Sequence, residues 1–533
     1  MEQTENRKTS LKTQGAWLLF AKFTGFVLAF LLPLLVVRYL SQEKVGVYRQ
    51  AFLFIMNAVS ILPLGFSMSS FYFLSRENER RNSVILNILL FNFATGALAC
   101  GVLFAFPQLL GRIFQNEELT RLAPLIGITI WLWIFSAFLE IVAVANREAK
   151  LSTVFIILAQ LTKTSLMAGA VILFSTVEAF LYAAIFQGVL QTAILLIYLA
   201  KKFPRFWLSF DSKFFREQAV YALPLGLAGV IYTLQTDLHN YFVSHRFGSA
   251  EFAVYAYGCF QLPLLVMLGE SVTSVLIPRM SELQKRGDTQ EIIRLTARAM
   301  QKLAFFYFPV YAFFLITAET FITTLFTEKF AASVPVFLIN ITILPFDIWI
   351  TDPIVRAYKE LGRFLLALRV FVLVALVGAL YFGSQNFGLR GMIGIVVVIT
   401  ILERAVTVFA VARKLGVEKK DFWLLNGVWK TAAAAITAGI ALFAFYFFGR
   451  EILLPLANET AAQILSVLKM EKFASFAGGS LFLGVCFIVF AVVYLPTAGF
   501  LGLIEDSEKE KLKSLRRRFF GRENESEPLP NEQ

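Results

Sequence analysis

The chain contains fourteen successive runs of about 20 apolar residues, and this feature restricts its fold more than any other. A helix of that length crosses the hydrocarbon region of a bilayer. Of the 533 residues, 58% are hydrophobic and only 16% are charged, whereas soluble domains carry about 25% charged residues. A single soluble core cannot bury so much apolar surface, because cores stop growing beyond about 250–300 residues. The sequence therefore predicts an all-α polytopic membrane protein.

The distribution of Lys and Arg predicts the orientation of the spans. Of the 49 Lys and Arg residues, 33 lie in segments on the side of the N-terminus, 11 lie on the opposite side and five lie within spans. Cytoplasmic loops carry an excess of Lys and Arg, so we expect both termini in the cytoplasm. The predicted spans are residues 15–37, 50–74, 84–107, 122–145, 151–174, 177–200, 217–243, 252–278, 303–326, 330–355, 364–384, 391–412, 424–448 and 473–500.

Two short segments of the chain are similar, residues 36–52 (VVRYLSQEKVGVYRQAF) and 243–259 (VSHRFGSAEFAVYAYGC). Each follows one predicted span and opens the next, and six spans separate the copies. Because six is even, the copies share their orientation, which is typical of parallel repeats related by an axis along the membrane normal. The aligned pairs are Tyr48 with Tyr255, Val47 with Val254, Gly46 with Ala253 and Val45 with Phe252.

The repeat divides the chain into two six-helix lobes related by a pseudo-twofold axis, followed by two C-terminal helices. A charged tail that ends in ENESEPLPNEQ cannot bury enough apolar surface to fold alone, so we expect it to be disordered. The expected parts are an N-lobe (residues 1–200), a cytoplasmic inter-lobe linker (201–216), a C-lobe (217–413), two extra spans (414–500) and the cytoplasmic tail (501–533).

The phrase RYLSQEKVGVY, Arg38–Tyr48, resembles the loop after the first span of polysaccharide-export flippases. These belong to the multidrug/oligosaccharidyl-lipid/polysaccharide (MOP) exporter superfamily, and the resemblance covers the whole chain. It implies an alternating-access flippase of the bacterial inner membrane. The cargo would be an undecaprenyl-diphosphate-linked oligosaccharide for O-antigen, capsule or exopolysaccharide biosynthesis. The implied partners are this lipid-linked substrate, membrane lipids and other polysaccharide assembly proteins.

Polar residues inside the spans are candidates for a substrate cavity, because a charge in the bilayer costs about 3 kcal/mol or more unless it meets water or a partner. Lys163 lies near the midplane of span five, and Gln160 shares its helix face. A hydrogen-bond cluster that only packs the lobe is the alternative. By the resemblance, Lys22 and Arg49 match cavity cations of lipid II flippases, although Lys22 can snorkel and Arg49 can be an interfacial cation. The remaining cavity candidates are Asn57, Gln187 and Gln191.

The second half of the chain carries more acidic residues within its spans. Buried carboxylates can take up H⁺ or Na⁺ and couple an ion gradient to transport. We therefore predict ion coupling at Asp237, Glu270 and Asp347, with a tertiary hydrogen bond as the alternative role of Asp237. Arg369 and Glu403 lie at similar depth in neighbouring spans and are predicted to form a structural ion pair.

Several classes of function are excluded by what the sequence lacks. It has no GxxxxGK[ST] phosphate loop and no HExxH or GxSxG motif, so we expect a transporter and not an enzyme. With two His and three isolated Cys, we expect no metal site and no cofactor apart from possible H⁺ or Na⁺ coupling. Scattered basic residues argue against nucleic acid as a partner. The alternatives are a cation-coupled multidrug exporter and a lipid II flippase; a glycan polymerase or ligase would need larger outer loops.

Overall fold

The structure is a computed structural model that describes residues 11–77, 79–467 and 469–503, without the side chains of residues 11–22 and 149. The described residues form helices and no strands, so the all-α prediction is confirmed. Most of the predicted tail lies outside the described residues. The first helices are α1 (Leu11–Tyr39), α2 (Gln42–Ile61), α3 (Phe66–Arg76), α4 (Arg81–Ala105), α5 (Gln108–Phe114), α6 (Glu117–Ala145), α7 (Ala149–Leu173), α8 (Val177–Lys202), η1 (Phe206–Leu208) and α9 (Ser212–Phe247).

The remaining helices complete the predicted order of spans. They are α10 (Ser249–Gly258), α11 (Pro263–Arg286), α12 (Thr289–Phe326), η2 (Glu328–Ser333), α13 (Val334–Ile341), η3 (Leu344–Phe346), α14 (Asp352–Ala357), α15 (Lys359–Asn386), α16 (Leu389–Leu415), η4 (Lys419–Leu425), α17 (Asn426–Val467), η5 (Glu471–Phe473) and α18 (Ala474–Phe500). Thirteen helical segments of the described chain are long and apolar enough to cross a membrane, and Phe23–Tyr39 is a shorter apolar helix. Together they correspond to the fourteen predicted spans.

Three predicted spans are interrupted, and the second, expected at 50–74, is divided between α2, which ends at Ile61, and α3, which begins at Phe66. The eighth, expected at 252–278, ends as α10 at Gly258 and resumes at Pro263. Proline suits the first position of a helix because its missing N–H would have no intrahelical partner there. The tenth, expected at 330–355, stops at Ile341, shortly before Pro345. A proline inside a helix removes a hydrogen bond and clashes with the preceding turn, which favours this break.

The chain forms two compact units, which we describe separately. The first unit contains residues 1–263, 319–343 and 360–406, and the second contains residues 264–318, 344–359 and 407–533. These units are not the predicted lobes, because parts of the C-lobe belong to each of them. The lobe boundaries therefore remain a prediction.

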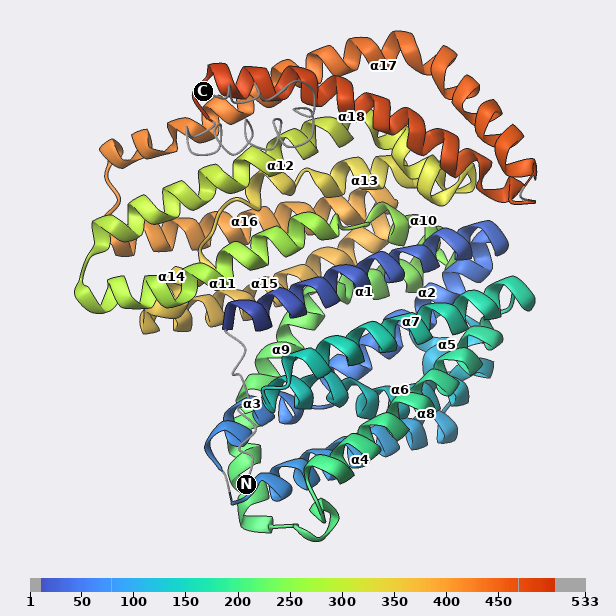
Figure 1. The fold of residues 1–533 in the computed structure, drawn as a ribbon, viewed down its shortest axis with the longest axis vertical. Coiled ribbons are helices and arrows are strands. Elements are labelled where there is room, and N and C mark those ends of the chain that lie inside the picture. Colours follow the sequence, from blue (N-terminus) through green and yellow to red (C-terminus); the bar gives the residue numbers. More distant parts are fainter. Residues whose placement is uncertain (1–10, 78, 468, 504–533) are drawn as a thin grey trace, which may run out of the picture. The chain divides into compact units, whose positions relative to one another are not determined.

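Helices α1 and α7 lie side by side in the first unit, and α6 packs against α4 and α8 (Figure 1). The buried faces of α6, α8 and α9 carry large apolar side chains, respectively Phe138, Leu195 and Phe214, which are fully buried in one cluster. With lipid outside, close packing of these side chains stabilises the bundle in place of the hydrophobic effect. This packing positions α2, α6, α7 and α8 around a shared space.

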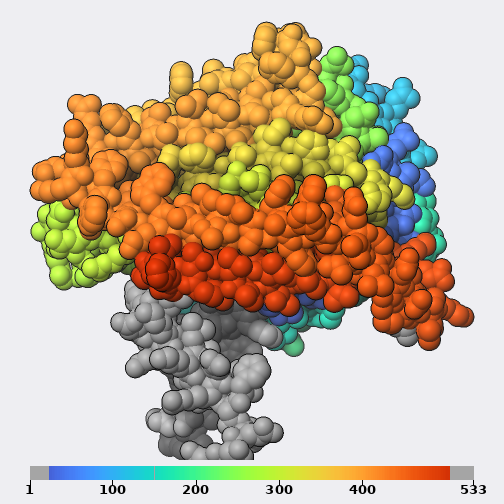
Figure 2. All heavy atoms as spheres, turned by 90° about the horizontal axis from the view of Figure 1, so that it is seen from above, coloured from blue at the N-terminus to red at the C-terminus, as the bar shows by residue number. Residues whose placement is uncertain are grey.

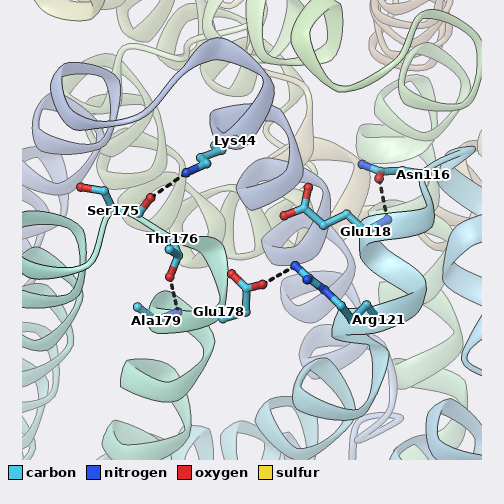
Figure 3. Close-up of polar contacts among 8 residues, drawn as sticks. All are labelled: Lys44, Asn116, Glu118, Arg121, Ser175, Thr176, Glu178 and Ala179. Atoms are coloured by element: carbon cyan, nitrogen blue, oxygen red, sulfur yellow. Dashed lines mark hydrogen bonds and ion pairs between the residues drawn. The ribbon is translucent and has the colours of Figure 1, made fainter.

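Helices α2, α6 and α8 of the first unit begin close together, and polar residues contact their N-termini (Figure 3). Lys44 of α2 donates to the Ser175 carbonyl just before α8 at 3.2 Å. Asn116 caps α6 by accepting from the Glu118 N–H at 3.0 Å, and Thr176 caps α8 by accepting from the Ala179 N–H. Arg121 of α6 and Glu178 of α8 point toward one another and form an ion pair. Such caps satisfy backbone N–H groups that have no intrahelical partner.

In the second unit, the long helix α17 runs beside α18, as Figures 1 and 2 show in orange and red. The small residues Ala434 and Ala438 of α17 are fully buried in their shared core with Phe482 of α18. A Cβ on Gly478 would lie 2.6 Å from the Asn458 Cα. Small residues thus let the two backbones approach closely, as is typical of helices packed in membranes.

Candidate functional site

The first unit contains a cavity of about 230 Å³ between α2, α6, α7 and α8. Four of the residues predicted to bind substrate line it together: Gln160, Lys163, Gln187 and Gln191. The cavity is lined by Met56, Val59, Trp133, Ser136, Ala137, Leu139, Glu140, Phe155, Ile156, Ala159, Gln160, Lys163, Gln187 and Gln191. It thus places a cation, a carboxylate and three amides among apolar walls.

Lys163 of α7 reaches across to α6, where its Nζ lies 4.3 Å from the centroid of the Trp133 ring. The indole is held in place because its Nε1–H donates to the Ala184 carbonyl of α8 at 3.0 Å. An ammonium over an indole face is attracted by the ring quadrupole, and this interaction strengthens where water is excluded. The ring therefore stabilises the cation while leaving its hydrogen-bond donors able to bind an anionic ligand.

The three amides of the cavity differ in their partners. Gln160 donates to the Thr164 hydroxyl at 3.2 Å, and Thr164 donates to the Leu28 carbonyl of α1, so this pair also joins α7 to α1. Gln187 and Gln191, one turn apart on α8, are only 4% and 7% exposed. Gln187 Oε1 and Gln191 Nε2 have no hydrogen-bond partner within the described structure. Buried amides without partners are rare, so their presence favours a binding role.

The residues that α6 contributes to the cavity were not predicted from the sequence. Trp133, Ser136 and Glu140 lie at positions i, i+3 and i+7 and share one face of α6. Glu140 is a carboxylate inside the predicted fourth span, so the same rule that singled out Lys163 could have found it. Trp133 offered no such signal, because an aromatic residue in an apolar run usually packs in the core.

Other predicted cavity residues lie elsewhere in the first unit. The Arg49 guanidinium lies over the Tyr257 ring of α10, with its Cζ 4.5 Å from the ring centroid. Asn57 donates to the Tyr241 hydroxyl of α9 at 3.1 Å. Neither residue lines the cavity that contains Lys163. Lys22 belongs to α1, but its side chain lies outside the described part of the chain.

The segments that repeat in the sequence pack against each other. Helix α2 contacts α10, and Gly46 lies against the backbone of Ser249 at the start of α10. Arg38, at the end of α1, donates to the carbonyls of Thr324 and Leu325 at 2.8 and 2.9 Å. His245, which aligns with Arg38 in the repeat, lies with its Nδ1 3.0 Å from the Ile113 carbonyl oxygen. Each repeat thus places one basic side chain on the carbonyl end of a helix.

The predicted acidic residues are divided between the two units. Asp237 of α9 is half-buried in the first unit, and Asn57 and Asn240 lie within hydrogen-bonding reach of its carboxylate. Glu270 of α11 is exposed and Asp347 is half-buried, and both belong to the second unit. Coupling at these positions remains a prediction.

Arg369 and Glu403 approach each other within the first unit. Arg369 Nε of α15 lies 3.7 Å from Glu403 Oε1 of α16, and the side chains are 36% and 14% exposed. Gln235 of α9 donates a hydrogen bond to the other Glu403 oxygen. Glu403 therefore joins three helices, α9, α15 and α16. This geometry is that of a tertiary ion pair with a supporting hydrogen bond.

Comparisons with known proteins bear on the fold and the family. Residues 35–335 match the family model of polysaccharide biosynthesis proteins. The fold is similar to that of the lipid II flippase MurJ in an inward closed conformation, with a TM-score of 0.67 and 13% identity over 91% of this chain and 98% of that one. No curated protein matches the sequence.

Two transporters of the MOP superfamily are also similar in fold. One is an inward-facing multidrug resistance MATE transporter, with a TM-score of 0.57 and 16% identity over 74% of this chain and 95% of that one. The other is a transporter from Pyrococcus furiosus described by the reverse polarity of its binding pocket, with a TM-score of 0.55 and 16% identity over 76% and 96%. At these identities the likeness shows the fold, and this fold is the one that the sequence predicted.

Proposed function

The chain belongs to the family of polysaccharide biosynthesis proteins, and from this premise we propose that it is a flippase for undecaprenyl-diphosphate-linked oligosaccharide. It would translocate this lipid across the bacterial inner membrane, with both termini in the cytoplasm, for surface polysaccharide biosynthesis. Other polysaccharide assembly proteins would supply and consume the lipid. The fold that it shares with MurJ and MATE transporters is a transporter fold, which supports a carrier and not an enzyme.

The cavity of the first unit is the observation that carries the proposal. Lys163 supplies a cation in a space that four helices enclose, and the amides of Gln160, Gln187 and Gln191 supply donors and acceptors. A cation next to amides suits an anionic group attached to a sugar, because the amides can pair with hydroxyl groups. A carrier of apolar cations would instead require an acidic cavity without such a Lys.

The proposed cycle is alternating access. Lys163, with Arg49 and Lys22 as further cations, would bind the diphosphate, and Arg is well shaped for a bidentate grip on phosphate oxygens. The amides and Asn57 would contact the sugars while the prenyl chain stays in lipid. The lobes would then rock so that the cavity opens to the other side of the membrane.

The energy source in this proposal is an ion gradient. Asp237, Glu270 and Asp347 would take up H⁺ or Na⁺, since carboxylates within membrane spans exchange such ions during transport. Asp237 belongs to the first unit, and its surroundings favour this role because Asn57 and Asn240 flank its carboxylate.

The test is complementation of a host strain that lacks this gene, with surface polysaccharide as the readout. Lys163→Ala should abolish or strongly reduce the polysaccharide, and Lys163→Arg should retain part of it because the charge remains. Lys201→Ala is the matched control, because Lys201 is exposed at the end of α8 and does not line the cavity. Normal polysaccharide from Lys163→Ala at equal protein level would refute the proposal.

Two other functions use the same fold, a cation-coupled multidrug exporter and a lipid II flippase. Asp237 is the observation that favours the exporter, because an acidic site can bind cationic drugs. Drug resistance and peptidoglycan synthesis in the same deletion strain separate the three functions. The proposed function requires that only surface polysaccharide depends on Lys163.

A further inference from the structure

A second cavity, of about 150 Å³, lies in the second unit between α12, α14, the end of α16 and η4. Apolar side chains form most of its wall, among them Ile293, Met300, Ile354, Val408 and Leu415. It shares no residue with the cavity that contains Lys163 and lies in the other compact unit. The cavity therefore offers a ligand an apolar surface that the proposed function does not use.

Two of the polar side chains that line this cavity, Asp421 and Thr296, already have partners. The Asp421 carboxylate accepts from Gln290 Nε2 at 3.0 Å and from the Glu418 backbone N–H at 2.9 Å. The Thr296 hydroxyl donates to the Ile292 carbonyl at 2.8 Å. A ligand that enters the cavity would find few free hydrogen-bonding groups there, so the interior suits a hydrocarbon chain and not a sugar or a phosphate.

The segment beside the cavity is strongly basic. Residues 413–420, which comprise the end of α16, the connection and the start of η4, contain four Lys or Arg and one Glu. Lys420 is paired with Glu418 at 2.9 Å. Arg413 and Lys419 are exposed, and no ion pair joins either of them to a carboxylate within the part of the chain that the structure describes. Two cations next to the apolar cavity can thus bind an anionic group.

Exposed aromatic residues follow the basic segment directly. Phe422 and Trp423 of η4 are 64% and 79% exposed, and Phe422 also lines the cavity. Aromatic residues are enriched where the headgroups meet the hydrocarbon, because their rings are apolar but tolerate water. Lys and Trp side by side at the end of a span therefore indicate that η4 lies at headgroup level, on the side that the distribution of Lys and Arg assigns to the cytoplasm.

We propose that this cavity binds an anionic diacyl phospholipid of the inner leaflet. Part of one acyl chain would enter the apolar cavity, and the phosphate would lie between Arg413 and Lys419. The charge of Arg413 and Lys419 complements an anionic headgroup, and the largely apolar wall of the cavity complements an acyl chain. In membrane proteins, basic pockets between helices on the cytoplasmic side bind the headgroups of anionic lipids.

The test uses the purified full chain in detergent and two probes, phosphatidylglycerol and phosphatidylcholine, with native mass spectrometry of the bound lipid as the readout. The wild type should retain phosphatidylglycerol in preference to phosphatidylcholine. Arg413→Gln combined with Lys419→Gln should weaken phosphatidylglycerol binding by about 25-fold, because each cation near an anionic surface contributes about fivefold. Both residues are exposed, so this variant should fold.

Lys285→Gln combined with Lys302→Gln is the matched control, since both residues are exposed and neither lines the cavity. It should bind as the wild type does. Ala412→Trp, which fills the cavity, should reduce binding of both lipids. Equal retention of the two lipids by the wild type, or an equal loss in the control, would overturn the proposal. A rise in bound phosphatidylglycerol after deletion of residues 504–533 would also overturn it, because the tail would then be the occupant.

Discussion

Gly46 and Ser249 meet so closely that a Cβ built on Gly46 would lie 1.8 Å from the Ser249 carbonyl oxygen. Real Cβ atoms do not approach a backbone oxygen at that distance, so only glycine fits while α2 and α10 keep this separation. The two helices carry the two copies of the repeated segment. The absence of a side chain at Gly46 therefore allows the close contact between the two copies.

We expect Gly46→Ala to destabilise the protein by about 1–3 kcal/mol, because the new methyl group meets backbone and cannot be accommodated by a rotamer change. The measurement is the midpoint of thermal unfolding in detergent, followed by size-exclusion chromatography of the heated sample. Gly101→Ala is the matched control, since it lies inside α4 with nothing within 4 Å of its Cβ position. In a helix interior, Ala in place of Gly is neutral or stabilising. Equal midpoints for the two variants would show that α2 can move away from α10 without cost.

Arg38 and His245 occupy aligned positions of the repeat, and Arg38 contacts two backbone carbonyls of a distant segment whereas His245 contacts one. Arg38 is 8% exposed, so the carbonyls of Thr324 and Leu325 would lose their partner without gaining water. We expect Arg38→Gln to cost about 1–3 kcal/mol for the unsatisfied groups. Arg38→Lys should recover only part of this, because an ammonium lacks the planar fork that contacts two carbonyls.

Urea or thermal unfolding of the detergent-solubilised protein measures this series. Arg112→Gln is the control, because Arg112 is exposed on α5. His245 is more exposed than Arg38 and makes one contact, so His245→Gln should cost less than Arg38→Gln. A larger loss at His245 would mean that the repeat positions are not equivalent in their contribution.

The positions of the spans could be predicted from the sequence more completely than the arrangement of the site residues on them. Hydropathy located the helices because lipid requires about 20 apolar residues for each crossing. Interior charges such as Lys163 are rare enough to be noticed one by one. The separation of Lys163, Gln187 and Gln191 from Arg49 and Asn57 could not be derived, because it depends on how the helices rotate about their axes.

Other features of the site were missed for identifiable reasons. Trp133 fills a position where an aromatic residue usually packs in the core, and its role depends on a cation that comes from another helix. The contact of the Arg49 guanidinium with the Tyr257 ring was also not predicted. Since Tyr257 lies in the second copy of the repeat, this contact depends on how the copies pack, which sequence alignment does not reveal.

Trp133 should influence transport through Lys163. Trp133→Leu removes both the ring face and the N–H that donates to the Ala184 carbonyl, whereas Trp133→Phe keeps a ring. We expect surface polysaccharide to fall strongly with Leu and moderately with Phe. A double-mutant cycle with Lys163→Met, measured by thermal unfolding, should give a coupling of about 0.5–2 kcal/mol. Additive effects would show that the cation and the ring act independently.

Asp237→Asn tests the proposed ion coupling. The amide keeps the size of the side chain and its contacts near Asn57 and Asn240 but cannot release or bind a proton. Transport in membrane vesicles should lose its dependence on an imposed pH or Na⁺ gradient. Asn240→Ala is the control that disturbs the surroundings but leaves the carboxylate. Transport by Asp237→Asn that retains its full gradient dependence would exclude this residue from coupling.

Glu403 should matter more for stability than its ion-pair partner Arg369. Glu403 is the more buried of the two, accepts from Gln235 as well, and connects α9 with α15 and α16. Glu403→Ala removes the acceptor that Arg369 and Gln235 share, so we expect a loss of about 1–3 kcal/mol. Arg369→Ala should cost about 1 kcal/mol or less, because the Arg369 side chain is 36% exposed. Glu403→Gln should lie between them, because the amide oxygen can still accept from Gln235 while the charge is lost. Thermal unfolding midpoints of the three variants give the order directly. If Arg369→Ala were the most damaging, the ion pair and not the bridge to α9 would be the main contribution of Glu403.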